Sequence, residues 1–242
     1  MEKNQYEIMR RLEDSFWWYV GMRRIVAALL PPPPPGAAPW RTLDAGCGTG
    51  ATLDFLAARG AVVGVDIASE ALRHCHERGH RLVSQGSVER LPFAGASFDL
   101  VTCLDVIYHR AVGDDLAALR EFYRVLRPGG VVLLRVPAYD WLRGAHDTAV
   151  HTRHRYTAGE VRLKLERAGF RVVRITHANC FLLPVAVAKR LGEGLGAVFP
   201  PDLEQPRPPL NRLLTALLGL EALVVQRADL PCGLSVIGVG VK

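Results

Sequence analysis

The stretch that most constrains what this chain can fold into is residues 43–50, LDAGCGTG. The residues before it have the pattern of a strand, and apolar residues at helical spacing follow it until Gly60 ends the pattern. Gly46, Gly48 and Gly50 therefore lie where a strand passes into a helix. They allow a tight turn with accessible backbone N–H groups, and the helix N-terminus behind them favours a negative group. Three alternate glycines at this place predict a cofactor-binding turn, because an ordinary strand-to-helix connection does not need them.

Two classes of cofactor fit this turn. The first two glycines and Ala51 satisfy the dinucleotide pattern G-x-G-x-x-G/A, and Asp66 follows at the distance of a ribose-binding acid. However, Asp44 would place a negative charge beside a pyrophosphate, and the third glycine, Gly50, is not part of that pattern. An acid next to bare N–H groups suits a cofactor with an amino group, a carboxylate and a ribose but no phosphate.

The turn resembles motif I, D-x-G-x-G-x-G, of the class I S-adenosylmethionine-dependent methyltransferases. Residues 87–101, which contain LPF and FDLV, are similar to the family segment that ends the third strand and contacts adenine. LRPGG at residues 126–130, just before an apolar run, is also similar to the family. The resemblance covers residues 41–176 and the last strand, and it implies S-adenosylmethionine as the cofactor.

The resemblance also implies which residues contact that cofactor. Asp66 is expected to accept from the ribose hydroxyls. Ser87 stands where the family often has an Asp that accepts from the adenine amino group, and the backbone N–H of Val88 can still reach the ring. The residues expected to bind the cofactor are Asp44, Gly46, Cys47, Gly48, Gly50, Asp66, Ile67, Ser87, Val88, Glu89, Cys103 and Leu104.

The chain as a whole alternates strand and helix patterns, which predicts an α/β fold with a doubly wound, Rossmann-like sheet. The resemblance implies seven strands in the order 3-2-1-4-5-7-6, with the last strand antiparallel. We expect the site at the carboxyl ends of the strands. Residues 1–36 are predicted to form a helical cap with a proline-rich spacer, and residues 37–242 a methyltransferase domain with a helical insertion at residues 181–230.

Catalysis by such a domain needs positioning and, for an oxygen or nitrogen nucleophile, removal of a proton. His109 follows the fourth strand in the segment DVIYH, where the family commonly has DVLEH, and is the first candidate base. A structural role for His109 is the alternative. His154 is the second candidate, on a polar loop expected over the site. Tyr156, with Arg153 and Arg155, is suited to holding an anionic or phosphate-bearing substrate.

Two apolar features leave alternatives open. Residues 16–19 are four consecutive aromatics, which either anchor the N-terminal helices or close over the cofactor or an apolar substrate. The Leu-rich helix predicted at residues 210–227 either packs on the body or contacts an apolar substrate or a membrane surface. Its apolar surface exceeds what one-sided burial needs, and arginines flank it. The functional alternative to plain packing is therefore an apolar or lipid-linked acceptor and a peripheral membrane contact.

Composition narrows the partners and the compartment. The net charge is +6, but the positive residues are spread along the chain, so we expect no nucleic-acid partner. Five scattered cysteines without a C-x-x-C pair predict neither a zinc site nor a disulfide framework. His74 and His76, two residues apart on a helix, face different sides, so no metal site is expected there. A charged N-terminus and the absence of a long uninterrupted apolar run predict a cytoplasmic location, with membrane association as the alternative.

The sequence thus predicts an enzyme that moves a methyl group to an oxygen or nitrogen of a small-molecule acceptor. A nicotinamide-dependent oxidoreductase would explain the glycine turn and Asp66, but not the LPF and FDLV passages, and a convincing Tyr-x-x-x-Lys pair is missing. A non-catalytic S-adenosylmethionine-binding module is the other alternative, and it would bind the cofactor without turnover.

Overall fold

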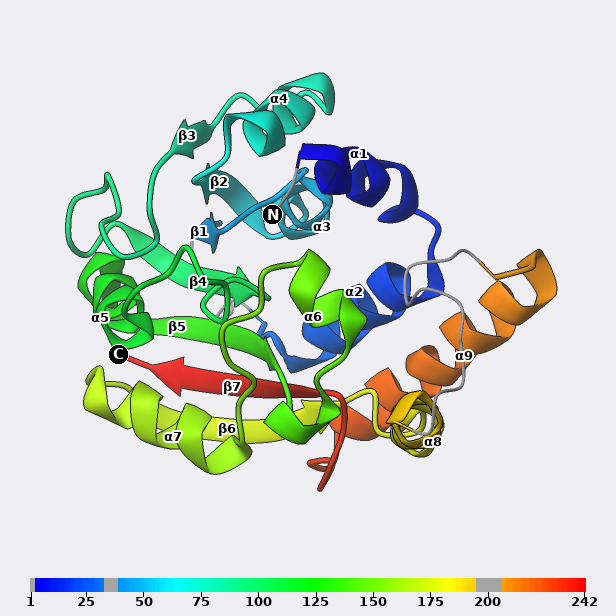
Figure 1. The fold of residues 1–242 in the computed structure, drawn as a ribbon. Helices are drawn as coiled ribbons and strands as arrows, with labels where there is room; N and C mark the ends of the chain where they lie inside the picture. The colour runs from blue at the N-terminus through cyan, green and yellow to red at the C-terminus, as the bar shows by residue number, and fades with distance from the viewer. Residues whose placement is uncertain (1–2, 33–38, 195–205) are drawn as a thin grey trace.

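The structure is a computed structural model that describes residues 3–32, 39–194 and 206–242. A sheet of seven strands in the order β3-β2-β1-β4-β5-β7-β6 crosses its centre (Figure 1). The strands are β1 (Trp40–Ala45), β2 (Gly60–Asp66), β3 (Val83–Gln85), β4 (Phe98–Leu104), β5 (Leu126–Pro137), β6 (Arg171–Ala178) and β7 (Ser235–Val241). Among these strands, only β7 runs antiparallel to its neighbours, β5 and β6. The predicted fold class and strand order are confirmed.

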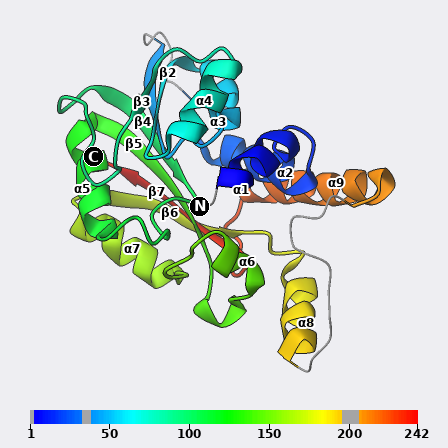
Figure 2. The same ribbon diagram turned by 45° about the horizontal axis from the view of Figure 1, so that its top comes forward.

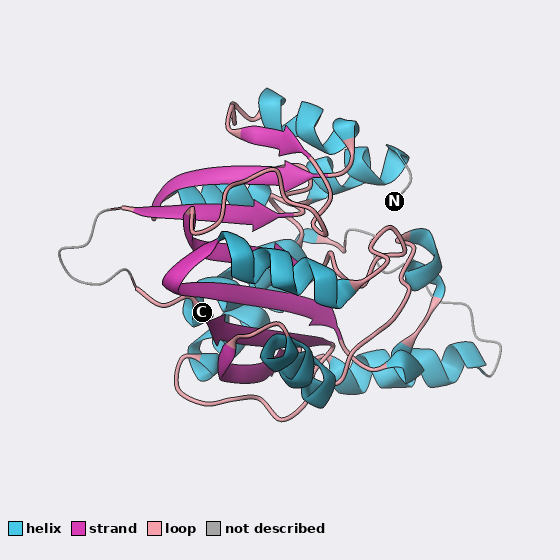
Figure 3. Ribbon diagram, turned by 90° about the vertical axis from the view of Figure 1, so that its left-hand side faces the viewer, coloured by secondary structure: helices cyan, strands magenta, loops and turns pink. Residues whose placement is uncertain are grey.

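Helices cover both faces of this sheet (Figure 3). They are α1 (Lys3–Leu12), α2 (Trp17–Leu29), α3 (Ala51–Ala57), α4 (Ser69–Glu77), α5 (Asp115–Val125), α6 (Ala145–Ala149), α7 (Ala158–Arg167), α8 (Leu183–Gly194) and α9 (Pro208–Val225), with a short 3-10 turn at Asp140–Leu142. Local signals set several boundaries. Asp114 caps α5 by accepting from two backbone N–H groups, and Thr157 with Glu160 forms a capping box on α7.

The start of β5 differs from the prediction. The sequence predicts a helix to Leu126, a stop at Pro128-Gly129-Gly130 and a strand from Val131. In the structure α5 ends at Val125 and β5 begins at once, with Leu126 paired to Phe98. The register then shifts so that Leu100 pairs with Val131, which accommodates the proline and the two glycines as an irregularity within the strand.

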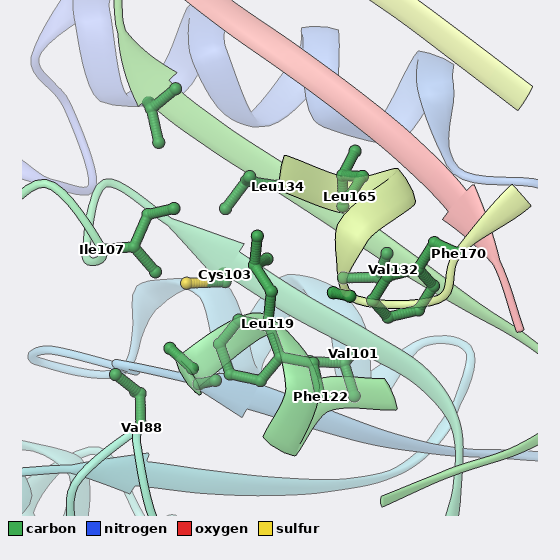
Figure 4. Packing of buried hydrophobic residues seen from close by; sticks show 14 of the residues in the cluster. Val88, Val101, Cys103, Ile107, Leu119, Phe122, Val132, Leu134, Leu165 and Phe170 are labelled. Carbon is green, nitrogen blue, oxygen red and sulfur yellow. The ribbon is translucent and has the colours of Figure 1, made fainter. Parts of the chain in front are cut away.

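Each face of the sheet has its own buried cluster. On one face, side chains of α5 and α7 pack against β4 and β5, including Leu119, Phe122 and Leu165 (Figure 4). On the other face, α2 and α9 lie side by side (Figures 1 and 2). They approach so closely that a Cβ added to Gly21 would lie 2.4 Å from Leu218 Cδ1. The predicted N-terminal cap and the predicted insertion therefore share one apolar layer on the sheet.

Parts of the predicted organisation fall on residues that the structure does not describe. The boundary at residue 36, most of the spacer at residues 31–36 and much of the proline-rich turn at residues 200–209 lie outside the described residues. The division of the chain at residue 36 therefore stays a prediction. The helices that flank the proline-rich turn, α8 and α9, are both described and both fall in the predicted insertion at residues 181–230.

Candidate functional site

A cavity of about 790 Å³ opens along the carboxyl edge of the sheet. It extends from the glycine turn after β1 and the ends of β2 and β3 to the ends of β4, β5 and β6, and α1, α2 and α8 contribute walls. Sites for small molecules have volumes of this order, and doubly wound sheets bind ligands at this edge. The cavity is therefore the candidate functional site, at the edge where the sequence predicted one.

The glycine turn forms one end of the cavity, and its conformation requires glycine. Gly46, Gly48 and Gly50 have φ angles of 85°, 53° and 96°. A Cβ on Gly46 would lie 2.2 Å from Val106 Cγ2, and one on Gly48 would lie 2.9 Å from Met9 Cε. A side chain at Gly46 would combine backbone strain with a clash against Val106, whereas at Gly48 the end of Met9 can move and the backbone strain is the main cost.

Asp66 lies beside this turn at the end of β2. Its carboxylate accepts from the backbone N–H groups of Gly48 and Ala68, both at 2.9 Å. The side chain is almost fully buried, and burial raises its pKa although these N–H donors oppose the shift. A carboxylate has about four lone-pair sites, so two remain for a ligand. Tyr6 of α1 lies close enough for the Asp66 charge, together with burial, to raise the tyrosine pKa.

The cavity brings together most of the predicted cofactor residues. Those that line it are Gly46, Cys47, Gly48, Asp66, Ile67, Ser87, Val88 and Leu104. They come from four separate strand ends, as expected for a ligand that crosses the carboxyl edge of a parallel sheet.

Four predicted residues lie behind the wall instead. Asp44 accepts from Thr102 Oγ1 at 2.7 Å, and burial raises its pKa to about 7. Gly50 faces Cys75 of α4, and Glu89 accepts from the backbone N–H of Asp114. Cys103 is fully buried in the core (Figure 4). Its neighbour Leu104 reaches the cavity because successive strand residues point to opposite faces.

His109 lines the cavity, but its hydrogen bonding does not match the predicted base. Burial, followed by nearby positive charge, lowers its pKa to about 4, so the ring is neutral at pH 7. Its Nδ1 accepts from the backbone N–H of Ala111 at 3.0 Å. A neutral imidazole that accepts at Nδ1 carries its proton at Nε2. This tautomer makes Nε2 a hydrogen-bond donor and leaves it unable to take a proton.

His154 and Tyr156 do not line the cavity. His154 pairs with Asp140 at 2.8 Å and with Glu160 at 3.1 Å. Tyr156 is fully buried, and its hydroxyl donates to Asp115 Oδ2 at 2.7 Å. The predicted loop does reach the site, through Asp147, Val150, Thr152 and Arg155. Arg155 and Tyr156 differ because adjacent residues of an extended segment face opposite ways. The contacts of His154 and Tyr156 are those of structural residues.

Comparison with known proteins identifies the domain that holds this cavity. Residues 43–134 match the family described as "Methyltransferase domain". A protein of Mycolicibacterium smegmatis named as a probable S-adenosylmethionine-dependent methyltransferase is 38% identical over 136 residues, covering 54% of this chain and 51% of its own length. Residues 43–134 are therefore a methyltransferase domain similar to that of S-adenosylmethionine-dependent enzymes. S-adenosylmethionine is the cofactor of that family.

Two more relatives extend the comparison. The ubiquinone biosynthesis O-methyltransferase of Idiomarina loihiensis is 37% identical over 114 residues, covering 43% of this chain and 46% of its own length. A Thermotoga maritima structure, described as an S-adenosylmethionine-dependent methyltransferase and possible histamine N-methyltransferase, has a TM-score of 0.65 at 19% identity and covers 99% of this chain and 95% of its own. This likeness concerns the fold. The chain spans about half the length of the curated relatives it matches.

The cavity continues beyond the predicted cofactor residues into a second half, which contains two side chains that the sequence analysis did not single out, Arg135 and Asp105. Arg135 of β5 donates to Asp105, which follows β4, at 2.5 Å, and its guanidinium lies 5.1 Å from the ring centre of Trp18. All four aromatics at residues 16–19 line the cavity, and Trp17 and Trp18 also pack against the buried cluster of α2 and α9. Asp105 directly follows a strand, a position that could have indicated it. The contribution of Arg135 depends on the pairing of β4 with β5.

Backbone strain is concentrated at this edge of the methyltransferase domain. Asp105, Tyr139 and Asn179 have φ angles of 59°, 57° and 63°, and they follow the carboxyl ends of β4, β5 and β6. Positive φ is uncommon for residues other than glycine and is found disproportionately at functional sites. Two of the three, Asp105 and Asn179, line the cavity.

Proposed function

We propose that this chain transfers a methyl group from S-adenosylmethionine to an oxygen or nitrogen atom of a small-molecule acceptor. The observation that supports this best is a cavity with two chemically distinct halves. One half holds the glycine turn and Asp66, and the other holds aromatic and apolar side chains of α2 and α8. A cofactor-binding module without turnover has no need of the second half.

The residues of the first half fit the cofactor. Asp66 has lone pairs left for the two ribose hydroxyls, and Gly46 and Gly48 leave no side chain between the backbone and a ligand. Ile67 is 55% exposed and lines the cavity, which supplies an apolar surface for the adenine, with Ser87 and Val88 at its edge. Asp44, just behind the turn, supplies a negative group for a ligand that carries positive charge.

The bound cofactor supplies a methyl group on a positively charged sulfur, which makes that group labile. The protein's task is then mainly to position the acceptor and exclude water. Tyr6 and Met9 of α1 cover the glycine turn, and Trp17 and Trp18 form an adjoining wall. We propose that His109 holds the acceptor through the proton on Nε2 and does not act as the base.

The proposal includes both oxygen and nitrogen as the methylated atom. The Idiomarina relative is named for O-methylation in ubiquinone biosynthesis, and the Thermotoga protein is described as a possible histamine N-methyltransferase. A donating His109 suits an acceptor oxygen, because oxygen keeps a lone pair free to accept from Nε2–H while another lone pair attacks the methyl group.

We also propose that the exposed face of α9 contacts anionic membrane lipids. Leu213, Leu220 and Leu223 are exposed there, while the one acid of α9, Glu221, is fully buried. Arg212 and Arg227 lie on either side of these leucines, as in a helix that lies at a lipid surface. Among the described residues, α9 alone has the length and composition to cross a membrane, although Arg212 and Glu221 interrupt its apolar run. Its packing on α2 favours a contact in the membrane plane.

The test of the methyltransferase proposal is calorimetric titration with S-adenosylmethionine and with NAD, followed by an acceptor screen. The screen uses methyl-labelled cofactor on a lysate divided into lipid and aqueous fractions. We expect binding of S-adenosylmethionine only, and label transfer to a small molecule. Binding of NAD instead would support an oxidoreductase, and cofactor binding without any transfer would support a binding module.

Replacement of Asp66 tests whether the titrated cofactor binds at this carboxylate. A charge-assisted hydrogen bond contributes roughly 1.5–3 kcal/mol, so we expect Asp66→Ala to weaken S-adenosylmethionine binding by about 10- to 150-fold. The variant should keep the circular dichroism spectrum of the parent protein. Unchanged affinity for S-adenosylmethionine in a folded Asp66→Ala protein would show that Asp66 does not bind the cofactor.

A further inference from the structure

One side chain of the cavity has unmet hydrogen-bonding capacity. Asn179 follows β6, is 0% exposed and lines the cavity, and neither its amide oxygen nor its amide nitrogen has a hydrogen-bond partner among the described residues. Buried polar side chains are nearly always hydrogen-bonded. A buried amide without partners at a binding cavity therefore indicates a hydrogen bond to a ligand. A ligand group that both donates and accepts would satisfy the two atoms.

The surrounding chain holds Asn179 in this position at some conformational cost. Its φ angle of 63° is one that asparagine tolerates better than most residues. Glu221 of α9 fixes the chain that follows, since its Oε2 accepts from the backbone N–H of Cys180 at 3.0 Å and more weakly from that of Phe181. A buried carboxylate thus stabilises the strained turn that keeps Asn179 in the wall of the cavity.

The wall around Asn179 is mostly apolar. Leu182, Val185 and Ala186 contribute from the chain at and before α8, and Leu214 contributes from α9. A ligand here must therefore have an apolar body in addition to its polar group.

Four cationic side chains of this half of the cavity lie near three acids. The pairs are Arg135–Asp105, Arg155–Asp147, Arg190–Glu193 and Lys189–Glu193, with N···O distances of 2.5, 2.8, 2.6 and 4.0 Å. Glu193 is the neighbour of two of these cations, so the four positive side chains have three acids between them. An anionic group only accepts hydrogen bonds, whereas the unpaired amide of Asn179 has both a donor and an acceptor. A neutral group that donates and accepts therefore fits Asn179 better than the anionic or phosphate-bearing substrate that the arginines suggested in the sequence.

The position of Asn179 in the sheet sets the length of the ligand. Between the end of β4, where His109 follows, and the end of β6 lie three strand spacings, or about 14 Å. A single functional group cannot reach from the methyl-transfer region to Asn179. The polar group that Asn179 meets is therefore remote from the nucleophile.

We propose that Asn179 is a specificity residue for an elongated acceptor with an apolar body. Its amide forms hydrogen bonds with a neutral hydroxyl or amide group at the end of the acceptor remote from the methylated atom. This inference rests on the proposed function, because it assigns the reacting end of the acceptor to the cofactor half of the cavity. A hydroxyl or amide both donates and accepts, as the oxygen and nitrogen of the Asn179 amide require.

The test uses two matched probes, 4-(6-hydroxyhexyl)phenol and 4-hexylphenol, which differ only in the terminal hydroxyl. Their binding is measured by calorimetry in the presence of S-adenosylhomocysteine. We expect the parent protein to bind the hydroxylated probe at least about 10-fold more tightly, the equivalent of one good hydrogen bond. Asn179→Gly removes the amide and tolerates the positive φ, so we expect it to abolish the preference without weakening cofactor binding.

The matched control is Ala96→Gly, at an exposed position outside the cavity with a φ of 54°. It makes the same kind of backbone change and should leave the preference intact. A parent protein that binds both probes equally, or neither, while binding the cofactor overturns the inference. So does an Asn179→Gly protein that keeps the preference. Failure of the parent to bind S-adenosylmethionine overturns the proposed function instead, and the probe comparison is then made without cofactor.

Discussion

The role of His109 depends on which of its ring nitrogens carries the proton. If Nε2 donates, as the Ala111 contact implies, glutamine can replace the ring, since its amide nitrogen also donates. We expect His109→Gln to keep methyl transfer within about 10-fold of the parent and His109→Ala to lose more, whereas removal of a general base costs roughly 10²–10⁴-fold. The measurement is kcat/KM with methyl-labelled cofactor and the acceptor from the screen. Equal, large losses of kcat/KM in both variants would instead support His109 as the general base.

The low pKa of His109 gives a pH dependence that can be measured without an acceptor. The folded value is about 4, below the value near 6.5 of an unfolded chain. The unfolded state therefore binds more protons between these values, and the stability contribution of His109 decreases as pH falls from about 6.5 to 4. Nitrogen-detected NMR of the histidine rings should show the Nε2–H form down to about pH 5. A midpoint near 6.5 would contradict the buried, Nδ1-accepting ring.

The raised pKa of Asp44 predicts the opposite pH dependence of folding stability. Burial raises its pKa to about 7, so the folded state binds more protons than the unfolded state between about 4 and 7, and its stability contribution decreases as pH rises through that window. A positively charged cofactor favours the ionised form. We therefore expect S-adenosylmethionine to bind more tightly as pH rises through 7, with proton release that is detectable by calorimetry in buffers of different ionisation enthalpy. Asp44→Asn should remove both effects, and an unchanged pH profile in that variant would exclude Asp44.

At the scale of elements, α9 has two faces with different consequences. Leu218 is fully buried against Gly21 of α2, whereas Leu213, Leu220 and Leu223 are exposed. Leu218→Gln should lower the free energy of unfolding by about 3 kcal/mol or more, since burying an amide adds to the loss of a core leucine. Replacing the three exposed leucines with Gln should leave the melting temperature unchanged.

The exposed leucines are tested with vesicles that contain anionic lipid. We expect the parent protein to sediment with them and the triple Gln variant to remain in the supernatant, because apolar contact and cationic flanks together hold such a helix at a lipid surface. Leu218→Gln controls for a general loss of structure. A parent protein that does not sediment would leave α9 as a core helix with an uncovered face.

At the scale of the whole molecule, α1 connects the N-terminal segment to the cofactor half of the cavity. Glu13, buried just after α1, accepts from Thr49 Oγ1 at 2.6 Å and pairs with Arg78 at 2.5 Å. We expect Glu13→Ala to lower stability by about 1.5–3 kcal/mol and to speed cofactor dissociation, measured by stopped-flow tryptophan fluorescence. Glu7→Ala removes an exposed pair with Arg73 from the same helix and should change little. Equal dissociation rates in all three proteins would exclude α1 as a cover.

The sequence by itself determined those features that depend on local conformation or on spacing within one segment. The glycine turn, Asp66 at a strand end and the capping box of α7 each follow from a few neighbouring residues. The strand order was predictable because the motifs of a known family occur at their expected spacing, and the matched residues 43–134 include most of those motifs.

Only the tertiary structure decided which side chains meet in the cavity. Arg155 reaches it and Tyr156 does not, because the pairing of their segment with the chain after β5 fixes which way each residue faces. Asn179 becomes a binding residue only because β6 ends at the same edge as β1, on the far side of three other strands. Orientation and partnership arise from packing between distant segments, which the order of residues along the chain does not specify.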